Sequence, residues 1–146
     1  MAFNAVELPE PTADLIAALE AAGLPTNDLH EPGRRFYRFE VDGRPIGYGG
    51  LEQIGLDGLI RSIVVIDSHR GAGHGSAILS LLETEAAGRK AAGLYLLTTT
   101  ATAFFERHGY VVLPRSAAPT AIAASRQFSA LCPTSATFMF KELRTQ

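Results

Sequence analysis

The 146-residue chain contains a single cysteine, Cys132, and it carries little excess charge of either sign. One thiol cannot form an internal disulfide or supply the several thiolates of a zinc site, so we predict no metal centre. The formal net charge is -2 and the 13 Lys and Arg residues are scattered along the chain. This distribution excludes the basic face of a nucleic-acid-binding protein, and it excludes an anchor on an acidic membrane surface.

Long hydrophobic runs are also missing. No apolar run approaches the roughly 20 residues that span a bilayer, and the first residues lack the basic start and apolar segment of a signal peptide. We therefore expect a cytoplasmic protein with no membrane partner. Hydrophobic residues make up 47% of the chain, which is enough to bury a core. Because no repeat or linker divides the sequence, residues 1–146 are predicted to form one domain.

The first half of the chain has the pattern of a short strand, a helix and a β-meander. We predict a strand over residues 3–7 and a helix over residues 13–22, with Thr12 as the N-cap. Alternating apolar residues then predict three antiparallel strands, and Asp42-Gly43 is a strong hairpin signal between the first two. The expected strands of this meander cover residues 35–41, 45–53 and 59–66.

The second half changes to alternating strands and helices. A helix over 76–92, ended by Gly93, and a strand over 94–98 complete a βαβ unit, whose two strands should be parallel with a right-handed connection. The whole pattern predicts an α/β (α+β) fold: a central mixed sheet, with an antiparallel meander followed by the βαβ unit and helices on both faces. The remaining expected elements are helices over 102–108 and 119–131 and strands over 110–113 and 136–143.

The turn between the last meander strand and the long helix is rich in glycine. Gly71, Gly73 and Gly75 permit positive φ and close approach of a ligand. The unpaired N–H groups and the dipole of the following helix form an anion site, to which Arg70 adds a full positive charge. A Walker motif would need a lysine before the helix, and a dinucleotide fingerprint would need glycine where Leu79 stands, so both are disfavoured.

In this setting, Arg70-x-x-Gly73-x-Gly75 resembles the Arg/Gln-x-x-Gly-x-Gly/Ala motif of the GNAT acetyltransferases, which cradles the pyrophosphate of acetyl-CoA. The segment from Ala101 to Tyr110 resembles the A-x-x-L/F-Y-x-x-x-G-F segment of the same family. The resemblance implies an N-acetyltransferase that uses acetyl-CoA and a small-molecule amine, and it implies a homodimer. The coenzyme-binding residues that it implies are Ile63, Val64, Val65, Arg70, Gly71, Ala72, Gly73, His74, Gly75, Ser76, Thr98 and Phe105.

The resemblance also implies direct attack of the amine on the thioester, with the Val65 N–H polarising the thioester carbonyl. Glu52 lies on the second meander strand, where family members often place a carboxylate, and it is the predicted base; the alternative is a solvated strand residue. Phe105 stands where the family has a tyrosine that protonates the departing thiolate. That acid is absent or replaced by water or another residue, so a CoA-binding sensor or regulatory protein without catalysis remains an alternative, as does an interaction module.

Residues 94–143 resemble one branch of the family, the acetyltransferase-like proteins of bacterial arsenic-resistance operons. The resemblance implies a small-molecule substrate, with Arg126, Phe128 and Cys132 as candidate contacts. Since one cysteine cannot form an arsenite site of three thiolates, the hypothesis for an arsenic link is an organic arsenical that bears an amine. The segments that carry this resemblance are Leu96-Leu97-Thr98-Thr99-Thr100, Phe104-Phe105 and residues 125–133.

Overall fold

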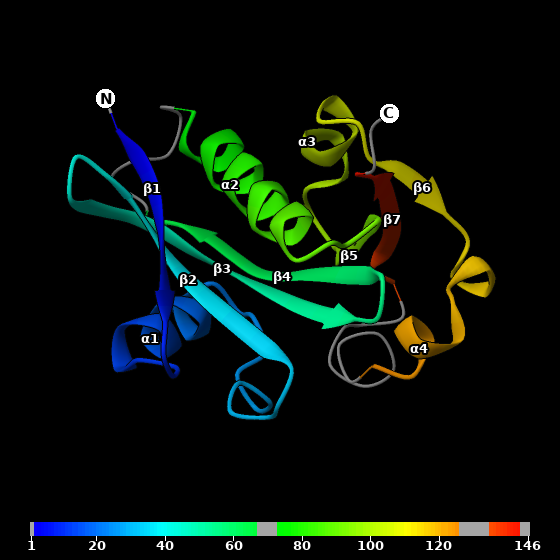
Figure 1. Cartoon of the computed structure of the whole chain (residues 1–146), viewed down its shortest axis with the longest axis horizontal. Helices are drawn as coiled ribbons and strands as arrows, with labels where there is room; N and C mark the ends of the chain where they lie inside the picture. Colours follow the sequence, from blue (N-terminus) through cyan, green and yellow to red (C-terminus); the bar gives the residue numbers. More distant parts are fainter. Residues whose placement is uncertain (1, 67–72, 126–134, 144–146) are drawn as a thin grey trace.

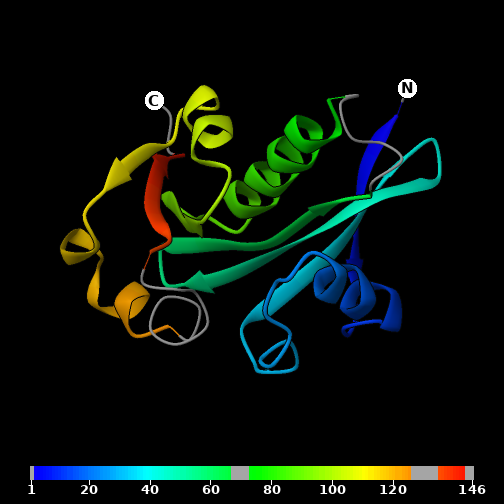
Figure 2. The same cartoon turned by 180° about the vertical axis from the view of Figure 1, so that it is seen from behind.

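A computed structural model of the chain describes residues 2–66, 73–125 and 135–143. Its centre is a seven-stranded mixed sheet in the order β1-β2-β3-β4-β5-β7-β6. Helix α2 covers one face of this sheet and α1 the other (Figures 1 and 2). This arrangement confirms the predicted fold class. The strands are β1 (Phe3–Leu8), β2 (Arg34–Val41), β3 (Arg44–Ile54), β4 (Asp57–Val65), β5 (Gly93–Thr98), β6 (Val111–Leu113) and β7 (Thr137–Glu142).

The helices lie close to their predicted positions in the first two thirds of the chain. They are α1 (Ala13–Ala21), α2 (His74–Gly88), α3 (Thr102–Arg107) and α4 (Thr120–Ala123), and a 3-10 turn, η2, covers Arg115–Ala117. Thr12 caps α1 as predicted, because its side chain accepts a hydrogen bond from the Leu15 N–H at 3.2 Å. None of these helices, within the ranges that the structure describes, is both long enough and apolar enough to cross a membrane.

The end of α2 corrects one prediction. The helix does not continue to Gly93 but ends at Gly88, and Lys90 then adopts a left-handed conformation with φ of 67°. The Ala91 N–H donates to the Ala86 carbonyl and the Lys90 N–H to that of Ala87, which is the hydrogen-bonding pattern of a Schellman cap. Gly93 is needed for a different reason: a Cβ there would lie 2.5 Å from the Phe140 ring.

The predicted helix over 119–131 is also wrong in its extent. The helical part, α4, stops at Ala123, and residues 126–131 lie outside the described residues. Ile122 in this short helix is fully buried, against Leu59, Tyr95 and Phe138. Burial of this side chain holds α4 against the sheet.

β4 pairs with β5 only through its first three residues, and the point where the two strands part positions the site. They pair in parallel, as predicted, but only from Asp57–Gly93 to Leu59–Tyr95. β4 then runs on to Val65 with β3 beside it, whereas β5 pairs along its full length with β7 on its other edge. Residues 60–65 of β4 therefore have one edge that no described strand occupies.

Two hydrophobic layers enclose the sheet. On the α2 face, Ile78, Leu79 and Leu82 are almost completely buried against side chains of β2, β3 and β5. On the α1 face, the apolar side chains form two separate clusters, one beneath α1 and one beneath α4. Charged residues of β2, β3 and β4 lie on this same face, next to the α1 cluster. The clusters are Leu8, Leu15, Leu19, Leu29, Phe36 and Tyr48 beneath α1, and Leu59, Tyr95, Ile122 and Phe138 beneath α4.

Candidate active site

The first turn of α2 presents backbone donors that the helix itself does not use. Gly73 is its N-cap, with φ of 80°, a conformation that glycine adopts without strain. The first helical bond runs from the Ala77 N–H to the Gly73 carbonyl, at 3.2 Å. The N–H groups of Gly75 and Ser76 precede it and have no partner within the helix. Together with the helix dipole, they form an anion-binding site.

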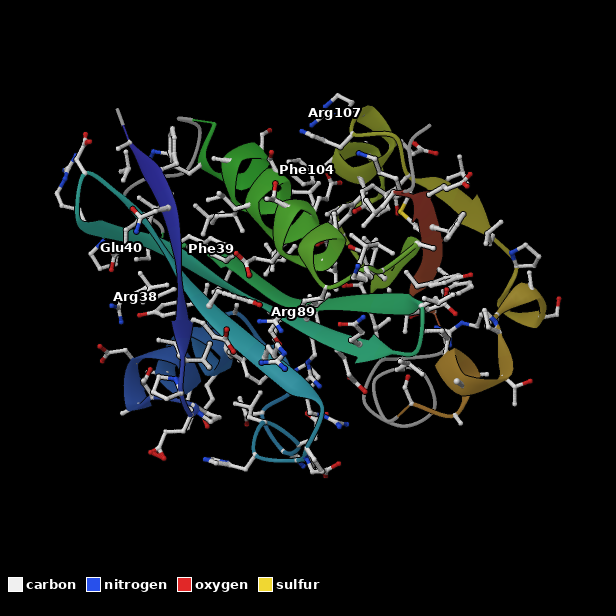
Figure 3. The ribbon with its side chains drawn as sticks, in the orientation of Figure 1. Arg38, Phe39, Glu40, Arg89, Phe104 and Arg107 are labelled. Atoms are coloured by element: carbon white, nitrogen blue, oxygen red, sulfur yellow. The ribbon has the colours of Figure 1, made fainter. Side chains whose placement is uncertain are left out.

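Helix α3 packs against this first turn through His108. The Nδ1 of His108 lies 2.9 Å from the Phe104 carbonyl, so Nδ1 carries the proton in the neutral ring. Nε2 then accepts a hydrogen bond from the Ser76 hydroxyl at 2.9 Å. The Phe104 ring lies where α2 and α3 approach each other (Figure 3), about 3.5 Å from the position of a Cβ at Gly75. These contacts hold the end of α3 against the first turn of α2.

The end of β4 adds a further free donor to this region. The Ile66 N–H bonds to the Ile46 carbonyl at 2.9 Å, and Val65 faces Gly47 in the adjacent pair of the register. Because antiparallel pairs alternate, the N–H of Val65 points away from β3, toward the edge that β5 has left. Val65 also packs near the first turn of α2, since its Cγ2 lies 3.9 Å from the position of a Cβ at Gly75.

The structure brings several of the predicted coenzyme-binding residues together and leaves others undescribed. Ile63, Val64 and Val65 are the last three residues of β4. The Thr98 hydroxyl, at the end of β5, accepts a hydrogen bond from the Ala101 N–H, where α3 begins. Phe105 is buried at 7% exposure between Phe104 and Tyr110. Six predicted site residues lie outside the described residues: Arg70, Gly71, Ala72, Arg126, Phe128 and Cys132.

Tyr110 does not replace the missing tyrosine at Phe105. Its hydroxyl donates to the Glu83 carboxylate at 3.0 Å, and the side chain is only 2% exposed. Burial, followed by the nearby Glu83 charge, raises the pKa of Tyr110. A phenol that is buried and already donating to a carboxylate is a poor proton donor for a departing thiolate.

Glu52 lies on the α1 face, in a group that we name the buried charge cluster: Asp28, Arg34, Glu52 and Arg61. The alternative of a solvated strand residue is wrong, because Glu52 is only 5% exposed. Burial raises the pKa of the Glu52 carboxyl, although the charges of Arg34 and Arg61 act in the opposite direction. A carboxylate with a raised pKa is a better proton acceptor, and the role of Glu52 as base stays a prediction.

Asp28 is the tightly bound carboxylate of the cluster. Arg61 donates to both of its oxygens, and the Arg34 Nε donates to Oδ2 at 3.1 Å. Burial alone would raise the pKa of Asp28, but the hydrogen bonds and charges of the two guanidinium groups outweigh it and lower that pKa. Sequence reasoning missed this cluster, because Asp28 lies in an expected loop and no local pattern joins it to Arg61, 33 residues later.

Asp28→Asn is expected to destabilise the protein by about 3 to 5 kcal/mol, because it leaves the Arg61 guanidinium buried without its counter-charge. The free energy of unfolding in urea measures this loss. Glu7→Gln is the matched control: Glu7 pairs with Arg35 and Arg89 at the surface, so its loss should cost at most about 1 kcal/mol. Equal losses for the two variants would contradict this interpretation.

The contribution of Asp28 to stability should also depend on pH. Since the pKa of Asp28 is lowered in the folded state, its contribution should be complete above about pH 5 and fade as pH falls below about 4.

Among the described residues, no group of three or more His, Cys, Asp or Glu side chains could hold a metal ion. The polar groups described above are backbone N–H groups, which donate hydrogen bonds, and a buried carboxylate, which accepts them. A helix start and a parted strand edge with free N–H groups are suited to a ligand that carries both phosphates and a carbonyl.

Comparison with known proteins agrees with this geometry. Residues 32–112, more than half of the chain, match the family described as the acetyltransferase (GNAT) domain. The chain belongs to the GNAT acetyltransferase family. The uncharacterized N-acetyltransferase YjcF of Bacillus subtilis is 39% identical over 71 residues, which are 48% of this chain and 51% of that protein. The match thus spans about half the length of this curated relative.

Solved structures of acetyltransferases share the fold across nearly the whole chain. N-acetylglutamate synthase of Neisseria gonorrhoeae, complexed with coenzyme A and N-acetyl-glutamate, has a TM-score of 0.74 at 17% identity, covering 97% of this chain and 36% of that one. A Mycobacterium tuberculosis protein in complex with CoA has a TM-score of 0.72 at 21% identity, covering 94% and 98%. An aminoglycoside 6'-N-acetyltransferase complexed with coenzyme A has a TM-score of 0.69 at 18% identity, covering 100% and 99%. At these identities the likeness establishes the fold alone.

Proposed function

We propose that this protein is an N-acetyltransferase that uses acetyl-CoA and a small-molecule amine. The observation that carries the proposal is that backbone donors from two elements come together: the N–H groups of Gly75 and Ser76 in the first turn of α2, and the Val65 N–H at the open edge of β4. β4 and α2 approach each other closely here, because Cγ2 of Val65 lies 3.9 Å from the position that a Cβ would take at Gly75. Membership of the GNAT family supports the same reading.

The residues present fit the coenzyme. The N–H groups of Gly75 and Ser76 would hold its pyrophosphate, with His74 and, in the preceding turn, Arg70, Gly71 and Ala72 as further predicted contacts. A Cβ at Gly75 would lie in ordinary van der Waals contact with Phe104 and Val65, so the backbone of Gly75 lies close to both side chains. The Val65 N–H would bind the thioester carbonyl oxygen, in line with the expectation from the sequence.

The coenzyme supplies an activated acetyl group as a thioester. The amine nitrogen forms a bond to the acetyl carbon as the bond from that carbon to sulfur breaks, and the sulfur leaves with the electron pair. The nitrogen loses one proton to a base, for which Glu52 is our candidate, and the thiolate takes a proton from water, because Phe105 cannot provide one. The N–H of Val65 stabilises the negative charge that develops on the carbonyl oxygen.

For the acceptor, the resemblance of residues 94–143 to proteins of arsenic-resistance operons favours one class to test first. An organic arsenical that bears a primary amine would be acetylated on nitrogen, and the arsenic atom would not take part in the reaction. Arg126, Phe128 and Cys132 are the candidate contacts for such an acceptor. If purified protein acetylates common amines and leaves amine-bearing arsenicals unchanged, the arsenic link is wrong.

The test of the proposed function is release of the CoA thiol from acetyl-CoA in the presence of a panel of primary amines. We expect thiol release that depends on both protein and amine, with formation of the N-acetyl product confirmed by mass spectrometry. Binding of acetyl-CoA without amine-dependent release for any amine would favour the sensor alternative. Failure of acetyl-CoA to raise the melting temperature would contradict the proposal altogether.

A further inference from the structure

We propose that His108 positions the Ser76 hydroxyl for the coenzyme, and that it takes up a proton from the solvent when the pyrophosphate binds. In the structure the Ser76 hydroxyl donates to His108. With the pyrophosphate bound, the protonated ring donates to Ser76 instead, and the hydroxyl turns to donate to a phosphate oxygen. This inference rests on the proposed function, which places the pyrophosphate at the first turn of α2 and gives the side chains around it no role.

A chain of hydrogen bonds joins the end of α3 to the first turn of α2. The His108 ring is held at both nitrogens, because Nδ1 lies 2.9 Å from the Phe104 carbonyl and Nε2 lies 2.9 Å from the Ser76 hydroxyl. The Phe104 ring packs beside the imidazole, with ring centroids 4.6 Å apart. A carbonyl can only accept, so Nδ1 donates and Nε2 of the neutral ring can only accept. The one hydroxyl proton of Ser76 is therefore committed to His108.

That commitment is unfavourable for an anion at the helix start. While the hydroxyl proton of Ser76 points to His108, the oxygen offers only lone pairs, which repel a phosphate oxygen. The N–H of Ser76 is one of the donors that the helix leaves unused, so a phosphate oxygen bound to it would lie close to the hydroxyl of the same residue. Protonation of Nε2 removes the conflict, because both ring nitrogens then donate and the hydroxyl proton is released to the phosphate.

Two helix ends act on the charge of His108 in opposite directions. His108 is the C-cap of α3, where the partial negative charge of the last carbonyls favours a cation. Its Nε2 faces the first turn of α2, whose partial positive charge opposes a cation. A bound pyrophosphate brings negative charge to that turn and removes the opposition. Histidine changes its charge between about pH 5 and 8, so both states are accessible near neutral pH.

The other charged groups around His108 do not couple it to the helix start in this way. Glu106 and Arg107 are exposed on α3, so solvent and salt screen them (Figure 3). Lys141 and Glu83 pair with each other at 3.1 Å, which largely cancels their charges. The titratable groups to consider are Glu106 and Arg107 on α3, His74 and Glu83 on α2, Lys141 on β7, and His69 and Arg70, which lie outside the described residues.

The test observes the imidazole of His108 in wild-type protein labelled with nitrogen-15 in histidine. The NMR signals of the ring nitrogens distinguish the neutral tautomers from the imidazolium ion, and those of His108 are assigned by their loss in His108→Gln. If that variant does not fold, the change of the Nε2 signal in Ser76→Ala assigns them. Spectra are recorded at about pH 7 with and without saturating dephospho-coenzyme A. This ligand keeps the pyrophosphate and lacks the 3'-phosphate, whose own ionisation would obscure proton uptake.

We expect the His108 ring to be neutral, with its proton on Nδ1, in the protein alone, and to carry a proton on both nitrogens when the ligand is bound. Calorimetry in two buffers of different ionisation enthalpy should then show proton uptake on binding. The affinity of the wild-type protein should fall by about tenfold between about pH 6 and 8, and His108→Gln should remove most of this dependence. His30, an exposed histidine, is the internal reference, and His30→Gln, the matched control, should behave as wild type.

A purely structural role of His108 would give a different result. His108→Gln would then lower the affinity equally at every pH and leave proton uptake unchanged. That outcome, or a His108 ring that stays neutral with the ligand bound, overturns the proposal. Since the readout needs no turnover, binding without protonation overturns only the present inference, and protonation without acetyl transfer to any amine overturns only the proposed activity. Absence of binding overturns both.

Discussion

Replacing Val65 with proline is expected to lower kcat for amine-dependent thiol release by about 10² to 10³-fold, the usual cost of removing one donor to a developing oxyanion. Proline has no N–H, and the register of β3 and β4 indicates that the Val65 N–H points away from β3. The sheet therefore keeps its hydrogen bonds, and only the open edge of β4 loses a donor. Steady-state kinetics with saturating acetyl-CoA would measure the loss.

Two controls separate this effect from damage to the strand. Val64→Pro removes the neighbouring N–H, which lies in the pair that bonds to β3, and should destabilise the protein by about 3 kcal/mol. Replacing Val65 with its α-hydroxy analogue, which exchanges N–H for oxygen and leaves φ free, should reproduce the kinetic loss of the proline variant. A folded Val65→Pro protein with kcat within about threefold of wild type would show that this N–H does not act on the carbonyl.

Gly75→Asp is expected to weaken acetyl-CoA binding by about 100-fold, or about 2.7 kcal/mol. A Cβ at this position meets only ordinary contacts, at 3.5 Å from Phe104 and 3.9 Å from Val65, so the substitution should be tolerated by the fold. An aspartate in the first turn even favours the helix dipole. Its negative charge would nevertheless lie in the site proposed for the pyrophosphate, and would repel it. Isothermal titration calorimetry measures the change in Kd.

The matched control for this variant is Gly88→Asp. Gly88 is the exposed last residue of the same helix, and a Cβ there meets nothing within 4 Å. The control adds the same charge to α2 at its opposite end, so its Kd for acetyl-CoA should stay within about threefold of wild type. Equal losses of affinity at the two ends would show that net charge, and not the helix start, governs binding.

The features that the sequence predicted well are those with short-range causes. Thr12 caps α1 because a threonine before an apolar stripe has a donor within reach three residues later. Asp42 and Gly43 form the tight turn between β2 and β3, with φ of 50° and 80°, because both residues tolerate a left-handed conformation. The glycine-rich start of α2 is likewise a local pattern, because its glycines lie within five residues of one another. This motif indicates the GNAT family, to which the chain belongs.

The features that the sequence did not predict depend on contacts between distant segments. Lys90 ends α2 through a Schellman cap, at a position where glycine is usual, so the sequence pattern points to Gly93 although the helix ends earlier. The three-residue strand β6 pairs with β7 and not with β5, an order that no local pattern specifies. The buried charge cluster is the clearest case, since only the register of β2, β3 and β4 brings Arg34, Glu52 and Arg61 together.

Calorimetry on the unaltered protein, comparing acetyl-CoA with acetyl-pantetheine, tests the central claim most directly. Both ligands carry the thioester, but only acetyl-CoA carries the pyrophosphate that the N–H groups of Gly75 and Ser76 would bind. We predict that acetyl-pantetheine binds at least about 100-fold more weakly than acetyl-CoA. Equal affinity for the two ligands, or no detectable heat with either, would contradict the assignment of the α2 helix start as the coenzyme site.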